Sequence, residues 1–205
     1  MNTSVTSCTA FNGTKLIASG SLREVALKAK QLLDRDKYAQ ILIFDDLTSE
    51  LVEVDFRGTP AQVTKRIEKM ASDSESGEAP AQDAEIRRPG RPKLGVVARE
   101  VTLLPRHWDW LASQPGGASV ALRKLVEQGI KANRNRDNLR GAQEATYRFV
   151  TAMAGNEPGY EEAIRALFSG QQKRFHATVE PWPADVREHA KRLGAAAFAT
   201  ADTAK

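Results

Sequence analysis

The feature that most constrains the fold is a segment near the middle of the chain that interrupts the hydrophobic patterning. Residues 72–85 read SDSESGEAPAQDAE, with five acidic side chains, no basic ones and no apolar periodicity. So few apolar groups cannot bury enough surface to fold. We therefore expect four regions along the 205 residues: a small α+β domain over 1–71, a flexible linker with a basic arm over 72–93, a mainly helical domain over 94–194 and a disordered tail over 195–205.

The first region predicts the element order ββαββα. Two short apolar stretches flank Asn12-Gly13, a dipeptide typical of tight hairpins. Ser21 begins a capping box at the start of a helix. The apolar run at 39–44 and the alternating residues 51–56 predict two further strands. Pro60, after a capping Thr, marks the first turn of a second helix.

The second folded region predicts a short strand followed by helices. Residues 96–104 favour a strand, and Pro105 favours the start of a helix that ends at Pro115-Gly116-Gly117. On that helix Trp108 fits the core face, whereas Trp110 is predicted to close a second contact, either a dimer interface or a contact with the C-terminal helices. The next helix begins at a capping Ser119 and carries an apolar face made by Leu122, Leu125, Val126 and Ile130. Three more helices are predicted over 139–153, after Pro158 and after Pro183.

These patterns together predict an α+β fold. We expect a small N-terminal ββαββα unit, a disordered acidic and basic linker, and a mainly helical C-terminal part led by a short strand.

The positive charge is concentrated in residues 86–150, which hold 13 Lys and Arg against 5 Asp and Glu, a net charge of +8. Charge gathered in this way attracts polyanions. Its first part, Pro89-Gly90-Arg91-Pro92-Lys93, resembles the AT-hook, a minor-groove peptide built around Arg-Gly-Arg-Pro, with Pro89 at the position of the first Arg. The predicted DNA-binding residues of this arm are Arg87, Arg88, Arg91 and Lys93.

A strand, a helix, a tight turn and a second helix follow over residues 99–131. This order resembles ribbon-helix-helix repressors, in which two chains pair their strands, and it also fits a helix-turn-helix. In the first interpretation Arg99, Val101 and Leu103 would face the groove. Both interpretations, and an ordinary helical hairpin, stay open. The predicted DNA-binding residues of this region are Arg99, Arg106, Arg123 and Lys124.

Several kinds of chemistry have no pattern in the sequence. Cys8 is the single cysteine, so neither an intrachain disulfide nor a thiolate metal cluster is expected. The three histidines lack metal-ligand spacing, and no phosphate loop or nucleophile elbow occurs. We therefore predict no metal, cofactor or catalytic residue. No apolar run is long enough to span a bilayer and the N-terminus lacks a secretory pattern, so we expect a cytoplasmic protein that does not enter membranes.

The leading hypothesis is a DNA-binding protein, such as a transcriptional regulator, that forms a homodimer if the ribbon interpretation holds. One alternative is an adaptor whose basic surface binds an acidic partner protein. A further alternative is an enzyme acting on an anionic small molecule, which predicts a pocket lined by Asp45, Asp46 or a histidine.

Long segments of the chain resemble a bacterial family known as a domain of unknown function. The resemblance rests on GRPKLGVVAREVTLLPRHWDWLASQPGGASVALRKLV, YRFVTAMAGNEPGYEEAIRALFSGQQKRF and WPADVREHAKRL, with TAFNGTKLIASG and ILIFDD. It covers most of residues 9–193. It implies bacterial origin and a cytoplasmic location, and it implies no activity, cofactor or catalytic residue.

Overall fold

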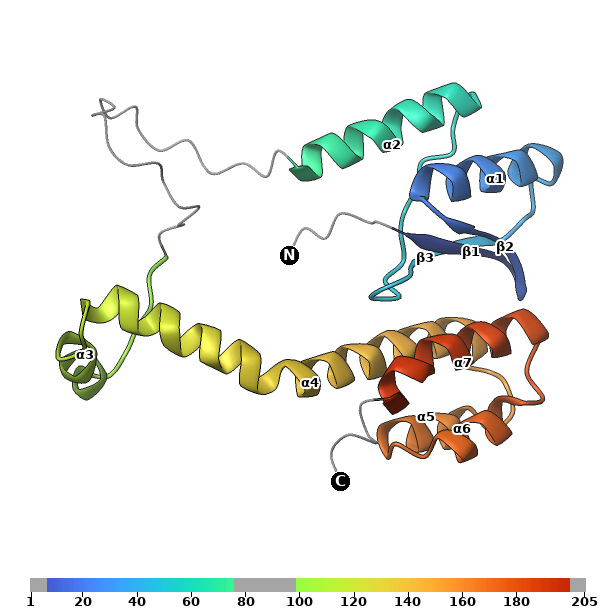
Figure 1. Cartoon of the computed structure of the whole chain (residues 1–205). Coiled ribbons are helices and arrows are strands. Elements are labelled where there is room, and N and C mark those ends of the chain that lie inside the picture. The colour runs from blue at the N-terminus through green and yellow to red at the C-terminus, as the bar shows by residue number, and fades with distance from the viewer. Residues whose placement is uncertain (1–6, 76–98, 200–205) are drawn as a thin grey trace. The chain divides into compact units, whose positions relative to one another are not determined.

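The computed structural model describes residues 7–75 and 99–199, and of residues 71–75 it describes only the backbone. Figure 1 shows a small sheet with two helices from the N-terminal part and further helices from the C-terminal part, which confirms the predicted α+β class. The strands are β1 (Cys8–Asn12), β2 (Lys15–Gly20) and β3 (Ile41–Asp45). The helices are α1 (Leu22–Arg35), α2 (Pro60–Glu75), α3 (Pro105–Ala112), α4 (Gly117–Ala154), α5 (Tyr160–Phe168), α6 (Gln172–Val179) and α7 (Ala184–Ala199).

The chain divides into two compact units. The first unit comprises Met1–Gly77 together with Asn135–Lys205, and the second unit comprises Glu78–Arg134. The first unit thus joins the N-terminal α+β part to the C-terminal helices. This grouping differs from the predicted regions, because residues on both sides of the linker share one hydrophobic core.

The central strand of the sheet in the first unit is buried on both of its faces. The strand order of the sheet is β2-β1-β3, and β1 pairs antiparallel with each neighbour. Successive side chains of a strand point to opposite faces. Cys8 and Ala10 accordingly pack in a cluster with Val25 of α1, whereas Phe11 packs in a cluster with Phe149 of α4. The central strand therefore holds helices on its two sides.

Aromatic rings make the contact between the sheet and the C-terminal helices. The ring centroids of Phe11 and Phe149 lie 5.4 Å apart, and those of Phe44 and Phe149 lie 5.2 Å apart. The imidazole of His189, on α7, lies 4.4 Å from the Phe149 ring. All four side chains are buried. One core therefore includes strands β1 and β3 and helices α4 and α7.

Local turn and cap patterns correctly predicted several element boundaries. Gly13 adopts a φ of +55° in the hairpin between β1 and β2, a left-handed conformation that glycine adopts easily. The Ser21 hydroxyl accepts from the backbone N–H of Glu24, whose carboxylate accepts in return, so the predicted capping box is present. Thr59 exchanges similar bonds with Gln62 ahead of α2.

The fourth predicted strand, over 51–56, is wrong. Leu51 alone forms a bridge, with Phe44, and one further bond runs from the Val52 amide to the Ile43 carbonyl. After that the backbone leaves the sheet edge, because the Asp55 carbonyl accepts from the Arg66 guanidinium on α2 instead of from a strand. The strand-like alternation reflects partial burial of Val52, Val54 and Phe56 in the core clusters beside α1.

The predicted C-terminal helices are present with corrected limits. The two helices expected at 119–131 and 139–153 are one helix, α4, because the residues between them contain no proline. Helix α6 was not predicted, since Phe175 and Val179 are its only buried residues. Helix α7 continues to Ala199, and burial of Phe198 explains why residues 195–199 are helical instead of a disordered tail; residues 200–205 lie outside the described residues.

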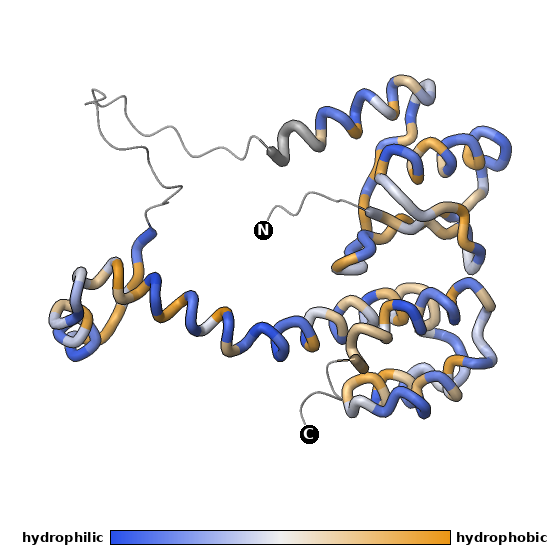
Figure 2. Tube along the Cα trace, in the orientation of Figure 1, coloured by the Kyte–Doolittle hydropathy of each residue, from blue (hydrophilic) through white to orange (hydrophobic). Residues whose placement is uncertain are grey.

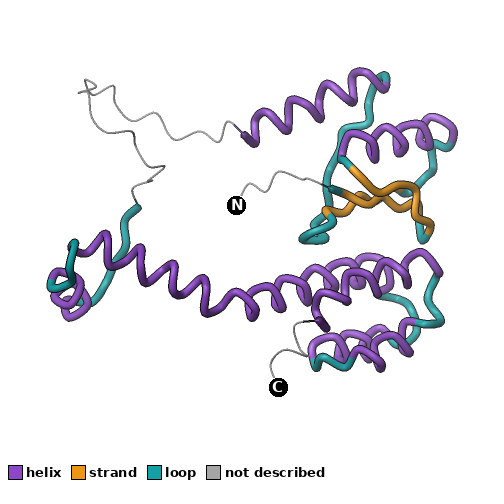
Figure 3. The backbone as a smooth tube through the Cα atoms, viewed as in Figure 1, coloured by secondary structure: helices purple, strands orange, loops and turns teal. Residues whose placement is uncertain are grey.

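The predicted strand at 96–104 is not formed over the residues that the structure describes. Residues 99–104 have no regular secondary structure, as Figure 3 shows for the loop that enters α3, and residues 96–98 lie outside the described part. A strand needs a hydrogen-bonding partner, and no described segment pairs with this one. In the described ranges, no helix combines the length and apolar character needed to cross a membrane.

We expect Phe149→Ala to destabilise the first unit by about 3–5 kcal/mol, because it removes a buried ring that contacts both the sheet and α7. Urea denaturation followed by circular dichroism measures this loss. The control is Tyr147→Ala, two positions earlier on α4 and exposed. Equal losses for both variants would contradict the assignment of Phe149 to the shared core.

Candidate functional site

The second unit is built around a turn between α3 and α4. Leu104 is the N-cap of α3, and Pro105 follows it in the first turn. Proline lacks a backbone N–H, but at this position that N–H would have no acceptor within the helix. Gly116 and Gly117 then adopt φ values of +87° and +74°, which reverse the chain within a few residues. A Cβ at Gly116 would approach the Val120 side chain to 3.2 Å, so the turn also depends on a close contact there.

The four predicted DNA-binding residues that the structure describes in this unit are all exposed. Arg99 lies in the loop before α3, Arg106 lies in the first turn of α3, and Arg123 and Lys124 lie on α4. The Arg123 guanidinium donates to the Ser119 carbonyl at 3.1 Å, which keeps it beside its own helix.

None of these four cations forms an ion pair with a described carboxylate. The first unit differs, since most of its arginines on the C-terminal helices are neutralised by a neighbouring acid. The pairs there are Arg140–Asp137, Arg148–Glu144, Arg165–Glu162, Arg174–Glu162, Arg187–Glu180 and Lys191–Glu180. On the C-terminal helices of the first unit most arginines thus have an acidic neighbour, whereas the four cations of the second unit have none among the described residues.

Two further cations extend this surface along α4. Lys131 and Arg134 are exposed and, at 100° per residue, fall on the same side of the helix as Arg123 and Lys124. We call Arg123, Lys124, Lys131 and Arg134 the basic arc. Glu127 is the one acid within it. Arg99 and Arg106 belong to other segments, and within the described ranges no hydrogen bond or ion pair joins them to the basic arc. Arg87, Arg88, Arg91 and Lys93 lie outside the described residues.

A cavity in the first unit was not predicted as part of the leading hypothesis. It has a volume of about 1060 Å³ and lies between the turn after β3, the second half of α4 and α7. Asp46 and His189 line it, as the alternative of an enzyme on an anionic small molecule anticipates. These residues come from segments far apart in the sequence, so no local motif could reveal the cavity.

His189 is the most unusual group of this cavity. It is 3% exposed, and its Nδ1 accepts from the Arg192 guanidinium at 2.6 Å, which leaves the proton of the neutral ring on Nε2. The buried Nε2 has no hydrogen-bond partner among the described residues. Burial, followed by the charge of Arg192, lowers the pKa of His189 from 6.5 to about 4. The imidazole is therefore neutral at physiological pH.

The acidic groups beside the cavity already have structural partners. Asp46 accepts from the hydroxyls of Ser7 at 2.5 Å and Thr9 at 2.6 Å. Asp45 accepts from the amides of Leu47 and Thr48, which closes the turn after β3. Burial and these two aspartates raise the pKa of the Cys8 thiol to about 12, so Cys8 is an unreactive thiol.

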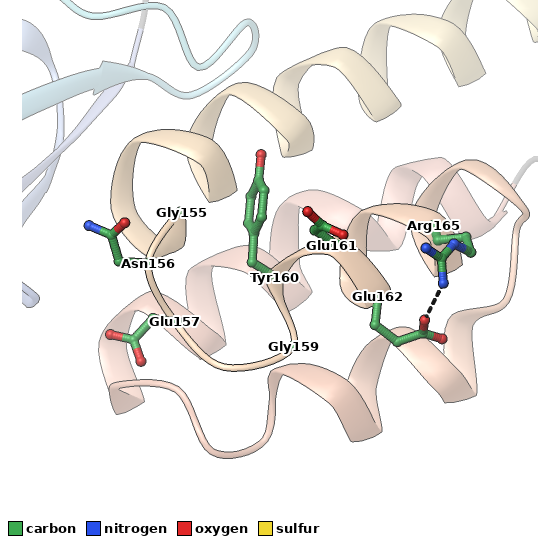
Figure 4. Close-up of a pocket in the computed structure, with 8 residues that line it drawn as sticks. All are labelled: Gly155, Asn156, Glu157, Gly159, Tyr160, Glu161, Glu162 and Arg165. Carbon is green, nitrogen blue, oxygen red and sulfur yellow. Dashed lines mark hydrogen bonds and ion pairs between the residues drawn. The ribbon is translucent and has the colours of Figure 1, made fainter.

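A second, shallower hollow lies between the end of α4 and the start of α5. Figure 4 shows Glu157, Glu161 and Glu162 around it, with an ion pair of 2.8 Å between Glu162 and Arg165. The Tyr160 hydroxyl is bonded to the Thr151 hydroxyl at 2.8 Å. Across the described part of the chain, no group of three or more His, Cys, Asp or Glu residues is placed to hold a metal ion.

The comparisons with known proteins identify a family without an assigned activity. A family model described as "Uncharacterized protein conserved in bacteria (DUF2239)" matches residues 7–194. No curated protein matches the chain, and no solved structure matches it. The resemblance inferred from the sequence is thus confirmed, and the function must be argued from the geometry.

The low pKa of His189 makes stability depend on pH. In the unfolded chain the ring binds a proton near pH 6.5, whereas in the folded protein it does so only near pH 4. The contribution of the neutral His189 ring to the free energy of unfolding is therefore fully present above pH 6.5, and roughly 3 kcal/mol of it is lost as the pH drops to 4. Urea denaturation at pH 7 and pH 4.5 should show a smaller loss for His189→Gln than for the unmodified protein.

A ring titration by nuclear magnetic resonance provides an independent check on the same histidine. A midpoint near 4 for His189 is expected. Equal pH-dependent losses in both proteins, together with a midpoint at 6.5 or above, would contradict the burial argument.

Proposed function

The chain belongs to the DUF2239 family of bacterial proteins, and we propose that it binds double-stranded DNA through its second unit. The observation that carries the proposal is the set of exposed cations without acidic partners: Arg99, Arg106 and the basic arc. Phosphates neutralised by such side chains release their counterions, which drives association without requiring a particular base sequence.

The second part of the proposal concerns the basic arm, which belongs to the second unit and lies outside the described residues. Arg87, Arg88, Arg91 and Lys93 lie within a stretch that contains Pro89 and Pro92. A proline-containing basic chain keeps an extended backbone, which suits the narrow minor groove of A·T-rich DNA. The arm would add affinity and a preference for groove shape, whereas Arg99, Arg106 and the basic arc would contact phosphates. As a DNA-binding protein, for instance a transcriptional regulator, the chain would act in the cytoplasm.

The two alternatives predict different partners. An adaptor would bind an acidic protein with the same cations, and an enzyme would bind a small anion in the cavity of the first unit. DNA is preferred over the small anion because the two arginines of that cavity are already engaged: Arg148 with Glu144 and the Thr48 carbonyl, and Arg192 with His189. DNA is preferred over an acidic protein because the arm resembles a groove-binding peptide.

Fluorescence anisotropy with a labelled duplex tests the role of the folded cations. We expect affinity to fall steeply with salt, with the slope of log K against log salt reduced by about 0.9 for each phosphate contact removed. Arg123→Ala with Lys124→Ala should flatten that slope. The matched control, Arg165→Ala with Arg174→Ala, removes the same charge from side chains held by Glu162 and should leave DNA affinity nearly unchanged.

No binding at about 50 mM salt would refute the proposal, since electrostatic association is strongest at low salt. Equal weakening by the two double variants would show that net charge alone matters and not the surface of the second unit.

The arm is tested by comparing two duplexes. Arg88→Ala with Arg91→Ala should weaken binding to an A·T-rich duplex more than binding to a G·C-rich duplex, because arginine is favoured in the narrow A·T minor groove. The preference is measured as the ratio of the two dissociation constants. If the double variant leaves this ratio unchanged, the arm does not contact the minor groove. That result would not bear on the proposed role of Arg99, Arg106 and the basic arc.

A further inference from the structure

The second unit exposes apolar side chains that its sequence pattern would place in a core. Leu111 and Ala121 are its only buried hydrophobic residues within the described range. Figure 2 shows that apolar segments recur in the chain that leads into α3, along α3 and along the first half of α4. Seven large apolar residues of this unit are between 40% and 62% exposed: Val101, Leu104, Trp108, Trp110, Leu125, Val126 and Ile130.

Three of these residues lie on one face of α4. Leu125, Val126 and Ile130 follow Leu122 at the spacing of an amphipathic helix. At 100° per residue the basic arc occupies a neighbouring sector of the same helix, with Arg123 and Arg134 next to Ile130. Between Leu122 and Ile130 the apolar face itself contains no charged residue. The helix thus has the pattern of a packed helix, and no described segment packs on its apolar face.

The loop before α3 has backbone groups that form no hydrogen bond with the described residues. Residues 99–103 include Val101 and Thr102, which favour strands, yet none of their backbone groups has a hydrogen-bond partner among the described residues. An extended segment with open N–H and C=O groups pairs readily with another strand. The same part of the chain therefore offers both an unpaired backbone and an uncovered apolar face.

We propose that the exposed apolar side chains of the second unit named above, which include the apolar face of α4, are covered by the same side chains of a second copy of this chain. In an isologous pair each copy supplies what the other lacks. The segment at 99–104 pairs antiparallel with its counterpart, and the apolar sides of α3 and α4 pack together beneath the paired strands. Lys124 and Lys131 of each copy then lie away from the contact, with Arg123 and Arg134 at its edge.

The exposed area fits such a pair. With roughly 150–250 Å² for a large residue, the seven side chains expose on the order of 700 Å² in each copy, close to the ~800 Å² per partner of a standard interface. Patches of this size are rare on proteins that stay monomeric. An acidic partner protein would bind the cations instead, since the apolar face has no charge to attract it.

Light scattering after size-exclusion chromatography of the full chain, without DNA, tests the pairing. The expected mass is twice the 22.5 kDa of one chain. Val126→Glu with Ile130→Glu should yield a monomer with an unchanged circular dichroism spectrum, because both side chains are exposed within one copy. The matched control is Leu47→Glu, an exposed apolar residue of the first unit, which should remain a dimer.

A cross-linking measurement distinguishes this face from any other contact and does not require the glutamate variants to fold. Val101→Cys should be joined between two copies by a short thiol-specific cross-linker, whereas Thr48→Cys should not. A monomer at tens of micromolar would overturn the inference, and so would a dimer that resists the glutamate substitutions. The result is independent of DNA binding, since no DNA is present.

Discussion

The packing of Phe149 against Phe11, Phe44 and His189 is the contact on which the first unit depends. A three-stranded sheet with two helices on one side leaves its other face open, and the rings of β1 and β3 on that face need a cover. Helices α4 and α7 provide it, through Phe149 and His189. Residues separated by the whole linker therefore share one core. His189 stays neutral inside it because burial disfavours the charged ring.

The second unit is organised differently, because many of its charged and apolar side chains have no partner among the described residues. Most arginines on the C-terminal helices of the first unit pair with neighbouring acids, whereas Arg106, Arg123 and Lys124 form no ion pair with a described carboxylate. Leu111 and Ala121 are buried, whereas Trp110 and Ile130 are exposed. Both kinds of unsatisfied group point to intermolecular contacts: polyanions on the cationic side and a second copy on the apolar side. A dimer would also double the number of phosphate contacts made by one particle.

The sequence predicted elements that depend on a few neighbouring residues. The hairpin at Asn12-Gly13, the capping box at Ser21 and the start of α3 at Pro105 follow from local hydrogen bonds and fixed dihedral angles, so a short motif determines them. The strand at 51–56 was wrong because pairing with β3 competes with the bonds of Arg66 to the Asp55 and Arg57 carbonyls. Helix α6 was not predicted because its apolar side is too short to show a helical periodicity.

The candidate surfaces were predictable to different degrees. The exposed cations could be read from charge density, since Lys and Arg are rarely buried. The cavity beside His189 could not, because it forms only when β3, α4 and α7 meet. The sequence predicted that α4 has an apolar face, but it could not show whether that face packs in the core of one chain or in an interface between two chains. A helix shows the same spacing of apolar residues in either case.

In the proposed complex DNA binds the second unit and leaves the first unit unchanged. Amide chemical shifts of the labelled protein, followed while a duplex is added at low salt, locate the binding surface. We expect shift changes at residues 87–93, at Arg99 and Arg106 and along the basic arc, with none around Phe149 and His189. Changes centred on the cavity of the first unit, or none at all, would contradict the proposal.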